Sequence, residues 1–124
     1  MSEHTAVIEW HAQESDFQGF TPDSYNRDHL VTFPNGETVH GSAAVDFFGN
    51  ENCVDPESLL IAALANCHML TFLAVANKQK IRVLKYRDEA VGVLGKNANG
   101  RAAVTQVTLN PKIDFEADNT PSAD

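Results

Sequence analysis

The sequence predicts an α+β fold in which antiparallel β-sheets pack around one long, buried central helix. Three observations favour this fold. Short strand-like segments separated by turn residues fill the first half of the 124-residue chain, Leu59–Ala76 is almost wholly apolar, and two longer strand-like segments follow it. The length and the 43% content of hydrophobic residues fit a single domain over residues 1–124.

The first half of the chain reads as strands and turns. The stretch Gln13–Asn26 is polar and contains glycine, proline and asparagine, so it is expected to be a long loop. An Asn35-Gly36 pair between two strand-like segments predicts a hairpin. The predicted strands here are Ala6–Trp10, Asp28–Phe33, Thr38–His40 and Ser42–Phe48.

A helix start precedes the apolar segment. Asp55 supplies a capping carboxylate, Pro56 suits the first helical position, and Glu57 complements the helix dipole. The length of Leu59–Ala76 is that of a membrane span. The interpretation as a span is rejected because polar residues lie mid-segment and a strong cap abuts its start; the polar residues are Asn66, His68 and Thr71.

A helix that is apolar on nearly every side is expected to be buried. A chain of 124 residues can hardly surround it. Two arrangements remain open: a sheet on one face and a loop on the other, or a partner subunit on the second face. Small residues would allow close backbone approach there, namely Ala62, Ala63 and Ala65.

Two long strands, Ile81–Leu94 and Arg101–Phe115, are expected after the helix. They are joined by the glycine-containing segment Gly95–Gly100, which predicts a second hairpin. The polar, acidic tail Glu116–Asp124 is expected to be a linker or a frayed end.

The charge and the cysteine content exclude several classes of function. Nine Lys and Arg against 17 Asp and Glu give a formal net charge of −8, which argues against binding to nucleic acid or to an anionic membrane. Two cysteines are too few for a disulfide scaffold, and their arrangement resembles no metal site. The N-terminal residues do not resemble a signal peptide, so a reducing, cytoplasmic location is expected.

Cys67 is the first candidate for a reactive side chain, although a mid-helix cysteine is ordinarily a small core residue. Its position gives it no help from the helix N-terminus, so a reactive thiolate would need a cation from elsewhere. The adjacent His68 points about 100° away around the helix and cannot form a dyad with it. His68 is expected to be hydrogen-bonded and partly buried.

The segment Asp55–Leu70, DPESLLIAALANCHML, resembles the signature helix of the OsmC/Ohr family of osmotically inducible and organic-hydroperoxide-resistance proteins. The family pattern has Pro-Glu at the helix start and a cysteine ten residues after the glutamate, which Glu57 and Cys67 match. With the flanking hairpins, the resemblance covers roughly residues 6–115 and implies an OsmC-like fold with an intertwined homodimer.

The resemblance implies a thiol-dependent peroxidase that reduces organic hydroperoxides, needs a thiol reductant and uses no cofactor or metal. Cys67 would be the peroxidatic thiolate, stabilised by an arginine that Glu57 orients. Arg27 matches this arginine best by its position before the hairpin strand. The other arginines, which read as solvated strand ends or hairpin residues, are Arg82, Arg87 and Arg101.

Helix geometry separates Glu57 from Cys67 by about 15 Å of rise and about 80° of rotation. A second, antiparallel copy of the helix would bring its own Glu57 beside the first Cys67. A site shared between two subunits agrees with the dimers of the family and accounts for the apolar helix.

The sequence departs from the family because it has no second cysteine after Cys67. Family enzymes resolve the oxidised cysteine with one in a later helix, and no cysteine follows Cys67. Cys53 lies before the cap, roughly 18 Å away along the helix, whereas a disulfide needs Cα atoms under about 7 Å apart. The C-terminal part of the domain is therefore expected to be missing after about residue 115.

Two other functions stay open. One is a non-catalytic protein on the same fold that binds a small apolar ligand in the interface cleft, because a fold does not determine a function. The other is a structural dimer with an inert Cys67.

Overall fold

The computed structural model describes residues 2–116. These residues form two compact units that join within the chain between Leu59 and Leu60. The expectation of a single domain stays a prediction.

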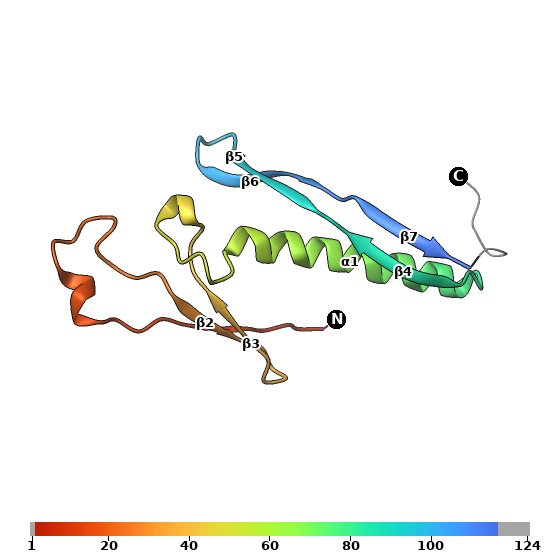
Figure 1. Cartoon of the computed structure of the whole chain (residues 1–124), viewed down its shortest axis with the longest axis horizontal. Coiled ribbons are helices and arrows are strands. Elements are labelled where there is room, and N and C mark those ends of the chain that lie inside the picture. Colours follow the sequence, from red (N-terminus) through yellow and green to blue (C-terminus); the bar gives the residue numbers. More distant parts are fainter. Residues whose placement is uncertain (1, 117–124) are drawn as a thin grey trace. The chain divides into compact units, whose positions relative to one another are not determined.

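The first unit contains a three-stranded antiparallel sheet in the order β1-β2-β3. Figure 1 labels β2 and β3 of this sheet. Val31 of β2 is a buried hydrophobic residue. Its elements are β1 (Val7–Glu9), the short 3-10 helix η1 (Glu14–Phe17), β2 (His29–Thr32), β3 (Thr38–Gly41) and the 3-10 helix η2 (Val45–Phe47).

The predicted Asn-Gly hairpin between β2 and β3 is confirmed. The Phe33 amide donates to the Glu37 carbonyl at 2.9 Å, and the Gly36 amide donates to the Phe33 carbonyl at 2.9 Å. Gly36 has φ +90°, a conformation that favours glycine. The turn chemistry therefore fixes the register of these two strands.

The prediction of a strand over Ser42–Phe48 is wrong. The chain turns back on itself there, with the Gly49 amide donating to the Ala44 carbonyl at 3.1 Å and Phe48 at φ +63°. A Cβ at position 49 would collide with the Ala43 carbonyl oxygen, so only glycine permits the turn. The fully buried Ser42 stabilises this turn, because its hydroxyl oxygen accepts from the backbone N–H of Asn50 at 3.1 Å.

The long helix α1 (Pro56–Lys78) begins at the predicted start and contains the apolar segment Leu59–Ala76. Asp55 accepts from the Ser58 amide at 3.2 Å and from its hydroxyl at 2.6 Å, as a helix cap does. At the other end Lys80 has φ +59°, and the Ile81 amide donates to the Ala76 carbonyl at 2.9 Å. This is a Schellman motif with lysine in the position that glycine usually takes.

The second unit contains α1 from Leu60 onward and a long antiparallel ribbon. The two long predicted strands, Ile81–Leu94 and Arg101–Phe115, are each divided in two. The strands are β4 (Val83–Asp88), β5 (Val91–Lys96), β6 (Ala102–Thr108) and β7 (Pro111–Phe115), with β4 paired to β7 and β5 to β6.

Side-chain hydrogen bonds cause the division of the ribbon. The backbone N–H of Asn110 donates to Asp88 Oδ1 at 2.8 Å, and its side-chain Nδ2 donates to the Glu89 carbonyl at 3.3 Å. These bonds replace the backbone ladder at the point where both strands are interrupted. The hairpin predicted at Gly95–Gly100 is confirmed, with Gly100 at φ +74°.

The ribbon runs alongside α1 (Figure 1). Gly92 permits the close approach, because a Cβ there would collide with the Ile61 side chain. Further along, the Phe72 ring lies 5.8 Å from the Tyr86 ring and 6.2 Å from the Phe115 ring. These aromatic contacts hold the helix to β4 and β7.

Residues 2–116 bury little of α1, in keeping with the expectation that a chain of this length can hardly surround it; burial against a partner subunit stays a prediction. Ala76 is the one buried residue of α1, and large apolar side chains such as Leu64 and Leu70 are exposed. By length and composition alone, α1 is also apolar enough to cross a membrane. Within the second unit, the described part of the ribbon therefore leaves most of the helix surface uncovered.

Candidate functional site

Cys67 lies in the middle of α1 and is exposed as a free thiol. In the single chain the thiol is not enclosed as that of a small core residue would be. An exposed sulfur is accessible to a small reactant from solution.

His68 is hydrogen-bonded, as predicted, but it is exposed rather than partly buried. Its Nδ1 lies 2.8 Å from the Tyr86 hydroxyl of β4. Burial, with a smaller contribution from the charge of Asp88, raises the pKa of the Tyr86 phenol. The His68 imidazole is thus engaged with the ribbon, which agrees with the prediction that it forms no dyad with Cys67.

Glu57 lies in the first turn of α1 and is half-buried. Its Oε2 atom is buried and has no hydrogen-bond partner among residues 2–116. The cap residue Asp55 is satisfied in contrast, and the Ser58 hydroxyl lowers the pKa of the Asp55 carboxyl. Glu57 therefore carries an acceptor without a donor at the base of the helix.

Arg27 lies in the loop before β2, in the first unit. Its Nη2 donates to the Pro22 carbonyl at 2.6 Å and its Nη1 donates to the Tyr25 carbonyl at 3.2 Å. The guanidinium also lies 4.0 Å from the centre of the Tyr25 ring and 5.4 Å from that of Phe48. An arginine has five N–H donors, so donors remain for a further acceptor.

The structure leaves these three residues in separate local settings. Among residues 2–116 the ion pairs join His11 to Glu9, Arg82 to Glu116 and Arg87 to Glu89, so neither Arg27 nor Glu57 takes part in one. The single helix α1 contains both Glu57 and Cys67, which preserves the rise of about 15 Å between them. The roles assigned to Cys67, Glu57 and Arg27 stay predictions.

Cys53 is a free, half-buried thiol in the turn before α1. Its amide donates to the Asn50 carbonyl at 3.1 Å. Within residues 2–116, no group of three or more His, Cys, Asp or Glu side chains has the geometry of a metal site.

A cavity of about 230 Å³ in the first unit was missed by the sequence reasoning. It lies in and beside the stretch Gln13–Asn26, for which the sequence pattern predicts only a polar loop. Four of the ten aromatic residues of the chain fall within residues 10–25, and this density is the signal that was overlooked. The lining residues are Trp10, Asp16, Phe17, Phe20, Thr21, Ser24 and Tyr25.

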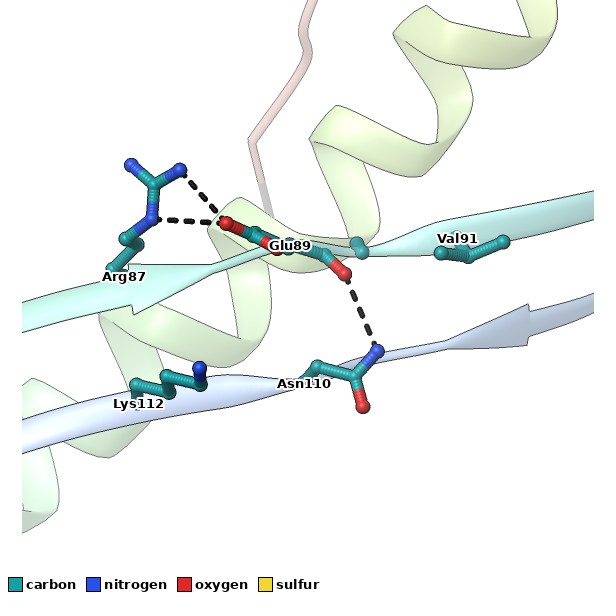
Figure 2. Close-up of a pocket in the computed structure, with 6 residues that line it drawn as sticks. Arg87, Glu89, Val91, Asn110 and Lys112 are labelled. Carbon is teal, nitrogen blue, oxygen red and sulfur yellow. Dashed lines mark hydrogen bonds and ion pairs between the residues drawn. The ribbon is translucent and has the colours of Figure 1, made fainter.

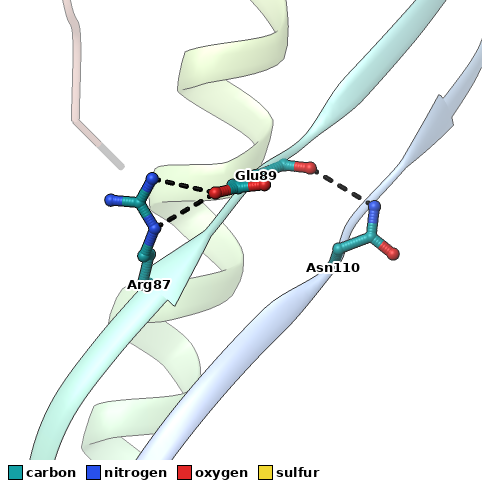
Figure 3. A network of polar contacts seen from close by, with 3 residues as sticks. All are labelled: Arg87, Glu89 and Asn110. Atoms are coloured by element: carbon teal, nitrogen blue, oxygen red, sulfur yellow. Dashed lines mark hydrogen bonds and ion pairs between the residues drawn. The ribbon is translucent and has the colours of Figure 1, made fainter.

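A second cavity, of about 410 Å³, lies where the ribbon is divided (Figure 2). Arg87 and Lys112 stand opposite each other on β4 and β7. Glu89 Oε1 accepts from Arg87 Nε at 3.2 Å and from Nη2 at 2.8 Å, while Asn110 holds the Glu89 carbonyl (Figure 3). The ion pair offsets the charge of Arg87, and because both side chains are exposed, solvent screens the interaction.

Comparisons with known proteins identify the family. A family model described as "OsmC-like protein" matches residues 49–123, which include Glu57 and Cys67. The chain belongs to the OsmC-like family. This family is broadly linked to peroxiredoxin-like activity.

A solved structure of an OsmC-like protein of unknown function from Vibrio cholerae is similar to this OsmC-like chain over nearly its whole length. The TM-score is 0.88 at 40% sequence identity, with 98% of this chain and 80% of the other chain covered. The predicted α+β, OsmC-like fold is thereby confirmed. A comparison with curated proteins gave no match.

Protonation of Asp16 is expected to loosen the loop Gln13–Asn26, which carries most of the aromatic residues that line the cavity of the first unit. Asp16 accepts from the backbone amides of Asn26 (2.7 Å) and Gln13 (2.6 Å) and from the Asn26 side chain, and these bonds lower the pKa of its carboxyl. Because the folded-state pKa lies below the unfolded one, this contribution to stability is complete above about pH 4 and is lost as the pH falls through the folded value.

The measurement is an acid titration of the fluorescence of Trp10, the single tryptophan, whose indole donates to the Asn26 carbonyl at 3.1 Å. Asp16→Asn should loosen the loop at neutral pH and remove its acid step, while Asp46→Asn in η2 serves as the control. An unchanged acid step in Asp16→Asn would contradict the assignment.

Proposed function

We propose that this OsmC-like protein is a cytoplasmic, thiol-dependent peroxidase that reduces organic hydroperoxides in oxidative-stress defence, with Cys67 as the attacking thiolate. The observation that carries the proposal is an exposed thiol on the same helix as a carboxylate with one buried oxygen that lacks a hydrogen-bond partner. Cys67 is free and exposed, and Glu57, ten residues earlier within the matched segment, has a buried oxygen without a donor.

The proposed chemistry is a nucleophilic displacement. The Cys67 thiolate attacks the terminal oxygen of R–O–O–H, the O–O bond breaks, and the alkoxide leaves and takes up a proton to become the alcohol. The cysteine becomes a sulfenic acid. A thiol reductant then condenses with the sulfenic acid, releasing water, and a second thiol reduces the disulfide to restore Cys67.

The two other proposed residues act on the charge of the sulfur. A guanidinium within about 4–6 Å favours a thiolate, and Arg27 has donors left for this purpose after its two bonds to backbone carbonyls. The unsatisfied Glu57 Oε2 is suited to accept from that guanidinium and to orient it.

A homodimer is part of the proposal. The exposed faces of α1 carry large apolar side chains, each of which gains roughly 1.5–3 kcal/mol when it is removed from water. An antiparallel second copy of α1 would cover them and would bring the Glu57 of one subunit toward the Cys67 of the other.

The first prediction separates the two cysteines. Cys67→Ser should abolish reduction of cumene hydroperoxide, because a serine hydroxyl is a poor nucleophile at neutral pH. Cys53→Ser is the matched control and should keep most of the activity. The measurement is peroxide consumption with a small dithiol as reductant, and equal loss in both variants would contradict the assignment.

The second prediction concerns Arg27. Arg27→Ala should move the midpoint of the pH profile for Cys67 alkylation upward by about one to three units, because a nearby positive charge is lost. Arg27→Lys should restore part of the shift. Arg101→Ala, at the end of the distant hairpin, is the control, and a profile that Arg27→Ala leaves in place would remove Arg27 from the site.

The third prediction tests whether the site is shared. Cys67→Ser and Glu57→Ala subunits, each impaired alone, should regain activity when they are co-refolded. In a twofold-symmetric dimer half of the statistical population is mixed and each mixed dimer has one intact site, so about a quarter of the wild-type activity returns.

The control for this mixing is the double variant Cys67→Ser/Glu57→Ala refolded with each single variant, which should give no such recovery. An absence of rescue in a verified mixed dimer would show that Glu57 and Cys67 act within one subunit. A folded monomer by light scattering would overturn the dimer itself.

A further inference from the structure

The aromatic cavity of the first unit has walls that are held in place. The Trp10 indole is fixed by its bond to the Asn26 carbonyl, and the Tyr25 ring is backed by the Arg27 guanidinium at 4.0 Å. The Phe17 and Phe20 rings complete the wall, with centroids 6.2 Å apart at an interplanar angle of 45°. Such a cavity binds without much reorganisation.

Phe20 is held in a conformation that is unfavourable for a bulky residue. It has φ +49°, directly after Gly19 at φ +84°, and its side chain is 80% exposed. An aromatic residue in the left-handed region is an outlier, and local strain of this kind is concentrated at binding sites. The strained turn presents an apolar ring at the cavity instead of packing it away from water.

The electrostatic surroundings of the cavity are negative. Asp16 lines it and is buried, and its hydrogen bonds keep the pKa of its carboxyl low, so it is ionised at neutral pH. Residues 13–28 contain four acidic side chains and one arginine, hence a net charge of −3. The faces of the aromatic rings add negative electrostatic potential.

We propose that this cavity binds the head group of a small organic cation, such as a quaternary ammonium or a methylated amine. Three or four aromatic rings around an ionised carboxylate form the arrangement that recognises such cations. The cavity of about 230 Å³ is smaller than the roughly 300–1,000 Å³ of pockets for drug-sized ligands, which fits a head group. The proposal is independent of the peroxidase chemistry of Cys67.

The chemistry of the lining disfavours the other ligand classes. An anion would meet Asp16, and Arg27 is not among the lining residues. A neutral apolar ligand would fit the rings but would gain nothing from the negative charge of Asp16, whose two oxygens are already hydrogen-bonded to Gln13 and Asn26. The charge of the ligand is therefore the property that the experiment varies.

The test titrates the full chain with tetramethylammonium and with choline, following the fluorescence of Trp10, the single tryptophan. The neutral isostere of choline, 3,3-dimethyl-1-butanol, and benzoate are titrated in parallel. The proposal expects saturable binding of both cations and clearly weaker binding of the neutral and anionic compounds. Equal or tighter binding of 3,3-dimethyl-1-butanol or benzoate, or no response to either cation, overturns it.

Variants distinguish a π-system from an apolar wall. Phe17→Leu keeps the wall apolar and should weaken tetramethylammonium binding roughly two- to tenfold. Phe47→Leu changes an equally exposed aromatic residue of the same unit that does not line the cavity, and it should leave binding unchanged. Equal effects of the two substitutions, or none from Phe17→Leu, also overturn the proposal.

Discussion

The apolar helix α1 is the constraint on which the rest of the structure depends. Its own chain buries only Ala76 of its 23 residues, and Val31 is the one other hydrophobic residue buried among residues 2–116. Neither unit therefore has a core of the size that usually offsets the conformational entropy of folding. With the ribbon on one side, the helix needs a second apolar surface on the other. In the proposed homodimer, folding and association of this OsmC-like chain would be one equilibrium that depends on concentration.

The same constraint bears on the proposed chemistry. A rigid helix keeps Glu57 and Cys67 nearly three turns apart, so a role for Glu57 at its own Cys67 requires a long bridge. An unsatisfied buried acceptor costs about 1–3 kcal/mol, and the free Glu57 Oε2 is such an acceptor. In the proposed dimer, a partner helix would cover the apolar face and bring its Cys67 toward this Glu57, and the Arg27 guanidinium would be the donor to Glu57 Oε2. The dimer and the peroxidase site are thus one proposal with two consequences.

The parts of the fold that follow from local chemistry were predictable from the sequence, and the parts set by distant contacts were not. Asp55, Pro56 and Asn35-Gly36 act on their immediate neighbours, and the helix and the hairpin begin where they indicate. The division of the ribbon depends on Asp88 and Asn110, 22 residues apart, and the aromatic cavity depends on the bond from Trp10 to Asn26, 16 residues apart. The turn at Gly49 depends on the Ala43 carbonyl, which no alternation of polar and apolar residues reveals. Cys67 and Glu57 stand at the positions that the family's Pro-Glu and cysteine pattern marks, whereas a loop position such as Arg27 has no fixed spacing from either.

Tyr25 joins the two proposed sites. Its ring lines the aromatic cavity, and the Arg27 guanidinium lies 4.0 Å from the ring centre without lining the cavity itself. A cation in the cavity and the Arg27 guanidinium would both contact the Tyr25 ring and would repel each other. Occupation of the cavity would therefore disfavour the present position of Arg27. A substitution at Tyr25 would disturb both sites and could not be attributed to either. Phe17 lines the cavity and makes no cation–π contact with Arg27 among the described residues. It is therefore the position at which the cation site can be weakened with the least effect on the proposed thiolate site.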